Sequence, residues 1–170
     1  MPGSERIVIG FDTSLRSTGI GVVSAKGTTY RALHYAPIRV PQARPMSQAL
    51  QLLNEAVGKI LDDFRPTEAA LETVFYAKNA RTAMILCHAR GVVVMNCAQR
   101  GIPVYEYSPS EIKRAVTGTG GAEKAQVQAM VSRILALPPP IQNDAADALA
   151  IALTHLHRTT GVMALQPQSI

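Results

Sequence analysis

Four acidic residues could form the chemical centre of this protein, because their types and positions suit the binding of divalent metal ions. Asp12 ends one run of apolar and β-branched residues, and Glu72 lies near the end of another. Asp144 and Asp147 lie in an alanine-rich stretch, where helical spacing would place both carboxylates on one face. Clustered carboxylates repel one another unless cations neutralise them, and such hard oxygen ligands suit Mg²⁺ or Mn²⁺ better than Zn²⁺.

The chemistry that this set predicts is metal-assisted hydrolysis of a phosphodiester. Two metal ions about 4 Å apart would hold the scissile phosphate, activate a water molecule and stabilise the leaving oxygen, so no protein nucleophile is needed. We therefore expect Asp12, Glu72, Asp144 and Asp147 to be catalytic residues and ligands of two Mg²⁺ ions per active site, with Mn²⁺ able to substitute. Taken singly, each acid also has a structural interpretation, as a turn residue or as a charge at a helix N-terminus.

The elements that must position these acids predict a mixed α/β domain. Strands are expected over residues 6–12, 19–24, 29–40, 68–74 and 103–107, and helices over 47–64, 79–100, 108–116, 123–137 and 143–157. The order β-β-β-α-β-α-β-α-α-α is that of the ribonuclease H-like architecture, a five-stranded mixed sheet with helices on both faces. We predict one nuclease domain over residues 1–158 and a flexible C-terminal tail over 159–170.

This arrangement should bring the acids together at one edge of the sheet. Asp12 and Glu72 would lie at the carboxyl ends of neighbouring parallel strands, where open α/β sheets place their ligands. Ala145, Ala146 and Ala148 are small, so the last helix could approach the sheet closely enough for its carboxylates to meet those on the strands.

Charge and composition limit the class of protein. Seventeen basic residues against twelve acidic ones give a net charge of +5, which favours a polyanionic partner without requiring one. The sequence has no signal-peptide pattern and no apolar run of membrane-spanning length, so we expect no membrane association and a cytoplasmic location. Cys87 and Cys97 lie too far apart on one helix to form a disulfide and are interpreted as buried thiols.

The longest predicted helix, over residues 79–100, is apolar on nearly every side. A helix without a clear polar face is usually buried, either in the core or against a second subunit. It is therefore our candidate for a subunit interface.

Several motifs resemble those of the RuvC-type Holliday junction resolvases. They are IGFD at 9–12 followed by STGIGVV at 17–23, LETVFYAKN at 71–79, ARGV at 89–92, GAEKAQVQ at 121–128 and NDAADALAIA at 143–152. The likeness covers about Ile7 to His157. Family members commonly have Pro-Gly directly after the first Asp, whereas this chain has Thr13-Ser14, which leaves the shape of that turn undetermined.

The resemblance implies a homodimeric, Mg²⁺-dependent endonuclease that makes paired symmetric nicks in four-way DNA junctions during recombination and repair. Asp12, Glu72, Asp144 and Asp147 match the catalytic acids of the family. In a bacterium, the branch-migration proteins RuvA and RuvB would be the expected partners.

Candidate DNA-binding residues surround these acids. An aromatic and basic loop follows Glu72, where aromatic rings could stack on unpaired bases and cations could hold phosphates. Phe75, Lys113 and Lys124 also match family residues near the DNA; their alternatives are a core contact for Phe75 and solvated helix positions for the lysines. The predicted DNA-binding residues are Phe75, Tyr76, Lys78, Asn79, Arg81, Lys113 and Lys124.

Three other functions are compatible with parts of the sequence. Gly-x-Asp followed by Thr-Gly on a hairpin also opens actin-like and sugar-kinase-like ATPases, but those need a second lobe for which this chain is too short. A non-catalytic junction-binding or scaffold protein could keep the same fold. A relative that prefers RNA or another branched nucleic acid is the third alternative.

Overall fold

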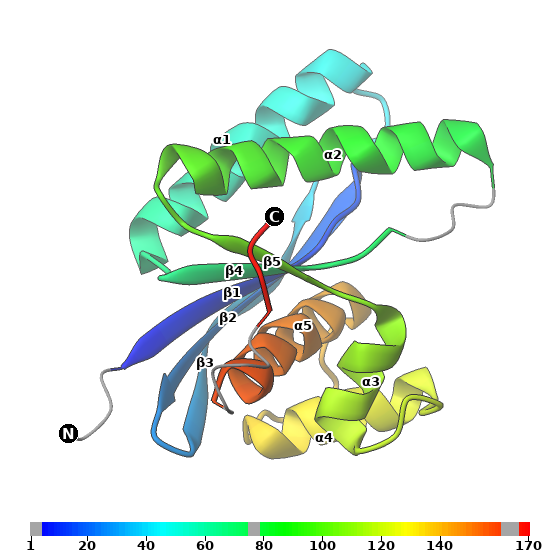
Figure 1. The fold of residues 1–170 in the computed structure, drawn as a ribbon. Coiled ribbons are helices and arrows are strands. Elements are labelled where there is room, and N and C mark those ends of the chain that lie inside the picture. The colour runs from blue at the N-terminus through cyan, green and yellow to red at the C-terminus, as the bar shows by residue number, and fades with distance from the viewer. Residues whose placement is uncertain (1–4, 75–78, 161–166) are drawn as a thin grey trace.

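The computed structural model describes residues 5–74, 79–160 and 167–170, and its elements follow the predicted order (Figure 1). The strands are β1 (Arg6–Asp12), β2 (Ser17–Lys26), β3 (Thr29–Arg39), β4 (Glu68–Glu72) and β5 (Val104–Tyr107). The helices are α1 (Met46–Phe64), α2 (Ala80–Gln99), α3 (Pro109–Thr117), α4 (Lys124–Ile134) and α5 (Asn143–Thr159).

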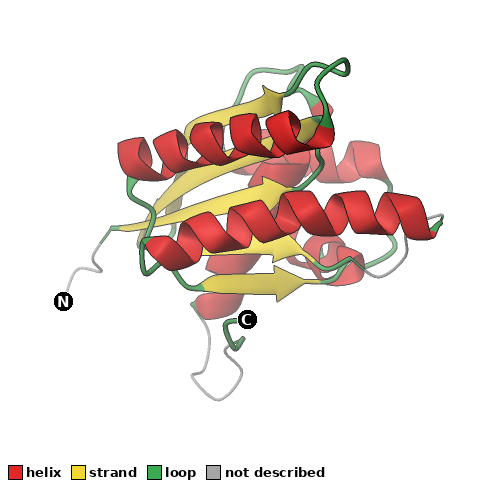
Figure 2. Cartoon of the chain, turned by 90° about the horizontal axis from the view of Figure 1, so that it is seen from above, coloured by secondary structure: helices red, strands yellow, loops and turns green. Residues whose placement is uncertain are grey.

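The five strands form one mixed sheet in the order β3-β2-β1-β4-β5. β1, β2 and β3 form an antiparallel meander, whereas β1, β4 and β5 run parallel. Helices α1 and α2 lie over one face of the sheet, and α3, α4 and α5 lie against the other (Figures 1 and 2). The predicted mixed sheet with helices on both faces is confirmed.

The largest error in the predicted boundaries is at the end of α4. The helix was expected to continue to Leu137, but it ends at Ile134. Ala136 adopts a left-handed conformation with φ of 50°, and the Leu137 amide donates to the Ser132 carbonyl, which turns the chain before the prolines that follow. Local backbone turning therefore ends this helix before the expected Leu137.

Side chains of the central strands alternate between two hydrophobic cores. Ile9 and Phe11 of β1 pack in the core beneath α1 and α2, whereas Val8 packs in the core formed with α5. On β4, Leu71 belongs to the first core and Ala70 to the second. By the same alternation, Asp12 and Glu72 belong on the α5 side of the sheet.

Helix α2 has a solvent-exposed side in the single chain. Val93 and Cys97 are buried, but Met84 and Met95 are 61% and 44% exposed. Cys87 is also exposed, so the prediction of two buried thiols is wrong for this residue, because it lies on a side of the helix that none of the described elements covers. Within the described residues, no helix combines the length and apolarity needed to cross a membrane.

A buried polar network joins α5 to strands β1, β4 and β5. The fully buried His155 is hydrogen-bonded through Nδ1 to the Tyr107 hydroxyl at 2.7 Å, and its Nε2 lies 3.4 Å from Glu68 Oε1. The Arg6 guanidinium donates to Glu68 Oε2 and to Thr159 Oγ1. His155 and Arg6 lower the pKa of the Glu68 carboxyl to about 2 against the opposing effect of burial. His155 therefore has a structural role in joining α5 to the sheet.

Glu68 is expected to make the protein sensitive to acid. Because its pKa is lower in the folded than in the unfolded chain, its contribution to stability is complete above about pH 4.5 and is lost as the pH falls towards about 2. We expect Glu68→Gln to lower the free energy of unfolding. This loss should be about 2 kcal/mol smaller at pH 3 than at pH 7. Urea unfolding at both pH values measures this. The exposed Glu55→Gln variant is the control, and an equal pH effect in the two variants would contradict the assignment.

Candidate functional site

Asp12 and Glu72 lie side by side at the carboxyl edge of the parallel strands. β1 and β4 pair in parallel, with Gly10 opposite Ala70 and Phe11 opposite Leu71. The next residue on each strand is an acid, Asp12 on β1 and Glu72 on β4, and both side chains are half-buried. The predicted convergence of the two strand acids follows from this register.

Helix α5 brings the other two acids to the same edge because glycines on β1 and β2 allow a very close approach. A Cβ atom on Gly19 would lie 2.0 Å from the Asp144 carbonyl oxygen, and one on Gly10 would lie 2.1 Å from the Ala148 carbonyl oxygen. Gly21 meets the backbone of Leu149 in the same way. Small residues therefore line both sides of the contact, the alanines of α5 and the glycines of the strands.

Each helix acid has a partner of its own. The Ser17 hydroxyl, at the start of β2, donates a hydrogen bond to Asp144 Oδ2. Lys124, the first residue of α4, places its Nζ 2.7 Å from Asp147 Oδ2, and this ion pair raises the pKa of the lysine. Ser17 thus orients one carboxylate, and Lys124 supplies a positive charge to the other.

The electrostatics of Asp12 show that the four acids act on one another. Burial, together with the negative charges of Asp147, Glu72 and Asp144, raises the pKa of the Asp12 carboxyl from 3.8 to about 7. Burial and Asp147 also raise the pKa of Glu72, while Lys124 and Lys113 oppose this effect. Such a site favours cations, because a positive charge would relieve the repulsion among the carboxylates.

Two adjoining pockets open at this edge and share Glu72 and Pro109. One, of about 340 Å³, is lined by Glu72, Asp147, Lys113 and Lys124, with an apolar wall that includes Ile112 and Val127. The other, of about 450 Å³, is lined by Asp12, Thr13, Glu72, Thr73, Val74, Leu86 and Pro109. Asp12, Glu72 and Asp147 therefore lie in an open cleft that a large substrate could enter.

The donor set fits hard divalent cations, since it consists of half-buried carboxylate oxygens whose mutual repulsion a cation would relieve. In the part of the chain that the structure describes, no three His, Cys, Asp or Glu side chains form a group that could hold a metal ion. The Asp144 carboxylate accepts a hydrogen bond from Ser17, and the Asp147 carboxylate accepts one from Lys124. Metal ions that bound these carboxylates would have to replace Ser17 and Lys124 as their partners.

The predicted DNA-binding residues have different surroundings. Lys113 and Lys124 line the pocket that contains Glu72 and Asp147. Arg81 is exposed on the first turn of α2, and the side chain of Asn79 caps that helix by accepting from the Thr82 amide. Phe75, Tyr76 and Lys78 lie outside the described residues.

Sequence reasoning missed three kinds of residue that build the site. It did not predict that Ser17 would contact Asp144, or that Gly10, Gly19 and Gly21 would set the distance between α5 and the sheet. It also missed Arg90, which donates to the Glu72 carbonyl at 2.8 Å and forms an ion pair with Glu106. The alternation Gly19-x-Gly21 could have indicated the close approach, since glycine in a strand often marks contact with another backbone.

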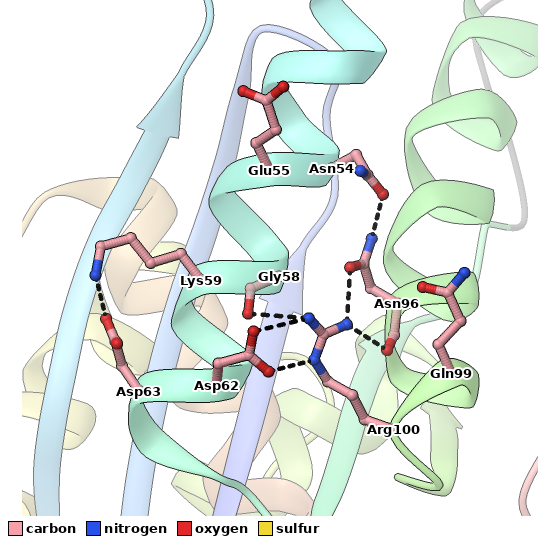
Figure 3. A pocket seen from close by; sticks show the side chains of 9 residues that line it. All are labelled: Asn54, Glu55, Gly58, Lys59, Asp62, Asp63, Asn96, Gln99 and Arg100. Atoms are coloured by element: carbon pink, nitrogen blue, oxygen red, sulfur yellow. Dashed lines mark hydrogen bonds and ion pairs between the residues drawn. The ribbon is translucent and has the colours of Figure 1, made fainter.

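A separate groove of about 530 Å³ lies between α1 and α2, and several of the polar side chains that line it contact one another (Figure 3). Arg100 pairs with Asp62, Lys59 pairs with Asp63, and Asn96 donates to Asn54. The Arg100–Asp62 and Asn96–Asn54 contacts join the two helices, whereas Lys59–Asp63 lies within α1.

Comparison with known proteins identifies a consistent set of relatives. A family model described as crossover junction endodeoxyribonuclease RuvC matches residues 8–155. The chain is 42% identical to the crossover junction endodeoxyribonuclease RuvC of Marinobacter nauticus, covering 92% of this chain and 89% of the relative. It is 45% identical to the protein of the same name from Chromohalobacter salexigens, over 94% of this chain and 85% of the relative.

Among solved structures, the fold matches T. thermophilus RuvC in complex with a Holliday junction substrate. The TM-score is 0.90 at 33% sequence identity, and the match covers 97% of this chain and 99% of the other. The ribonuclease H-like architecture predicted from the order of elements is thereby confirmed.

Proposed function

The chain belongs to the RuvC family of crossover junction endodeoxyribonucleases, and from this premise we propose that it cuts four-way DNA junctions by paired hydrolytic nicks in recombination and repair. The observation that carries the proposal is the convergence of four acids at one sheet edge, where burial and the negative charges of Asp147, Glu72 and Asp144 raise the pKa of the Asp12 carboxyl to about 7. Keeping these carboxylates ionised together is unfavourable without a positive charge nearby, so the arrangement favours a role in binding cations.

We propose that Asp12, Glu72, Asp144 and Asp147 hold two Mg²⁺ ions and that Mn²⁺ can replace them. When bound, these ions supply the charge that activates water and stabilises the leaving oxygen. The chain's own residues position this chemistry: Ser17 orients Asp144, and Arg90 holds the end of β4 through the Glu72 carbonyl. Lys124 and Lys113 face the same pocket, where a cation can stabilise negative charge that develops on the phosphate.

The proposal is tested by incubating the purified protein with a mobile four-way junction or with linear duplex of the same sequence, in Mg²⁺ or in EDTA. Paired nicks are expected in the junction alone and only with metal. Tight junction binding without nicks would instead favour a scaffold protein. Equal cutting of duplex and junction would exclude structure-selective cleavage, and an RNA junction in parallel tests the remaining alternative.

In addition to pairing with Asp147, Lys124 is expected to speed cleavage of the junction. We predict that Lys124→Ala slows single-turnover cleavage about a hundred-fold at saturating protein, because a cation beside the scissile phosphate is lost. Lys124→Arg should recover part of the rate, since it keeps the charge with a different shape. Lys59→Ala, which removes an exposed lysine on α1, is the control. Equal rates for Lys124→Ala and the control would contradict this role.

We propose that the loop after Glu72, with Phe75, Tyr76, Lys78, Asn79 and Arg81, contacts the DNA near the crossover. In a bacterium, RuvA and RuvB are the proposed partners, and a cytoplasmic location follows from such a role.

We also propose that residues 1–158 form the nuclease domain and that residues 159–170 form a C-terminal tail. Near the end of that tail, the Ile170 amide donates to the Val104 carbonyl.

We also propose that two copies pair through the exposed side of α2, because a two-fold junction requires two nicks in symmetric strands. Two exposed apolar side chains of α2, Met84 at 61% and Met95 at 44%, support this surface. Met84→Glu is expected to shift the protein from dimer to monomer in light scattering, while circular dichroism stays unchanged. The matched variant Leu52→Glu, on the exposed side of α1, should leave the dimer intact. Dimers that persist in Met84→Glu would place the interface elsewhere.

A further inference from the structure

The excess positive charge of this chain lies in one continuous part of its sequence. Residues 13–54 contain five Lys and Arg and no Asp or Glu, whereas the rest of the chain contains twelve residues of each sign. This part forms the edge of the sheet, β2 and β3, and leads into α1. The net charge of +5 is therefore a property of one side of the molecule.

Arg39 lies at the end of this edge that adjoins the acidic site. On the antiparallel ladder it pairs with Ser17, whose hydroxyl donates to Asp144. Its own Nη2 donates to the side chain of Gln142 at 3.1 Å, directly before the first turn of α5. The exposed Arg39 guanidinium thus lies beside the part of α5 that carries Asp144.

Arg44 is held near the same end by a turn over residues 41–44. The Arg44 amide donates to the Pro41 carbonyl at 3.2 Å. The Arg16 guanidinium donates to the Pro41 carbonyl at 2.8 Å and to the Arg44 carbonyl at 2.9 Å, which fixes the turn against the start of β2. Arg16 therefore positions the turn, and Arg44 is exposed on it.

The charges of Arg39 and Arg44 are not neutralised by carboxylates. Within the described ranges, neither arginine forms an ion pair, and each donates to a neutral glutamine side chain instead. By contrast, Arg6, Arg90 and Arg100 pair with Glu68, Glu106 and Asp62. Exposed guanidinium groups without acidic partners are suited to binding phosphate, because they can present several N–H donors to it.

We propose that Arg39 and Arg44 form a phosphate-binding site for a DNA arm that leaves the cleavage site along the β3 edge. This inference rests on the proposed function and adds a second DNA contact, on the side of Asp12 away from Lys113 and Lys124. The two arginines would hold the backbone without reading the sequence, since contacts to phosphate position the duplex rather than specify bases. Arg16 acts through the turn, as a positioning residue.

The test is a binding titration in EDTA, with a four-way junction and a linear duplex, at several salt concentrations. Arg39→Ala and Arg44→Ala should each weaken binding to both DNAs about five-fold near physiological salt, and the double variant about twenty-five-fold. Each substitution should reduce the slope of log affinity against log salt by about 0.9, the value for one lost phosphate contact. The Lys variants at both positions should keep most of the affinity.

Arg133→Ala, at an exposed position in the last turn of α4, is the matched control and should bind as wild type does. If wild type cuts the junction but the double variant binds both DNAs with unchanged affinity and salt slope, the inference is overturned and the proposed function stands. If wild type cuts nothing while the double variant still loses duplex binding and slope, the inference stands and the proposed function fails. A wild-type protein that binds neither DNA overturns both.

Discussion

Asp12→Asn is expected to abolish junction cleavage and, at the same time, to stabilise the metal-free protein. Losing one carboxylate from the cation-binding set should remove about 4 kcal/mol of transition-state stabilisation, which corresponds to about a thousand-fold in rate. Junction binding in EDTA should remain. Asp63→Asn, which removes an exposed aspartate that pairs with Lys59, is the control and should cut at the wild-type rate.

The stabilising effect of Asp12→Asn should depend on pH in a defined direction. The pKa of Asp12 is about 7 in the folded protein against 3.8 for an ordinary aspartate, so the folded state disfavours its charged form. The wild-type protein therefore loses stability as the pH rises from about 4 through 7, because the unfolded chain ionises first. We expect Asp12→Asn to be more stable than wild type at pH 8 by about 2 to 4 kcal/mol, and similar to it at pH 4.

Denaturant unfolding in EDTA at pH 4 and pH 8 measures this difference. Adding millimolar Mg²⁺ at pH 8 should stabilise wild type more than Asp12→Asn, since a ligand stabilises only the folded state that binds it. A variant that is less stable than wild type at pH 8 would show that Asp12 is structural. A variant that still cuts would exclude it from catalysis.

Gly19→Ala is expected to destabilise the fold strongly, although it adds only one carbon atom. Its Cβ atom would lie 2.0 Å from the carbonyl oxygen of Asp144, and the obstruction is backbone, which no side-chain rotation can relieve. Either α5 or β2 must move, at a cost of about 3 kcal/mol or more. We expect the Tm to fall by about 10 °C and cleavage to fall even at temperatures where the protein stays folded, because Asp144 is displaced.

Gly121→Ala is the matched control for this experiment, since a Cβ atom there meets no atom within 4 Å. It should leave both the Tm and the cleavage rate unchanged. Thermal unfolding followed by circular dichroism and a cleavage assay well below the Tm separate the two effects. A Gly19→Ala variant that unfolds and cuts as the control does would mean that α5 does not need its close approach to the sheet.

Several features of the fold were predictable because they depend on local sequence. The run of apolar and β-branched residues over 6–12 predicted β1 with its observed bounds. Ser108-Pro109-x-Glu111 is a helix-start signature, and the Ser108 and Glu111 side chains cap α3 where its helix was expected to begin. The acids at the ends of β1 and β4 could be placed at one edge because carboxyl ends of parallel strands coincide. The first two predictions required only interactions within single elements, and the third required only that β1 and β4 run parallel.

Features that depend on contacts between distant elements were not predictable from the same patterns. The exposure of Cys87 depends on which side of α2 faces α1 and the sheet, and an apolar helix gives no signal of that side. The contact of Ser17 with Asp144 joins residues 127 positions apart, and nothing in the composition around Ser17 distinguishes it from a turn serine.

The sequence by itself determined the order of elements, the identity of the four acids and the excess of positive charge over residues 13–54. Only the tertiary structure decided how close α5 lies to the sheet, which partner each acid has, and that Arg39 and Arg44 lie at the acidic end of the β3 edge. The physical reason is that a strand or helix forms from interactions within a few residues. Distances between side chains at the site are set by packing across the whole domain, here by three glycines facing the backbone of α5.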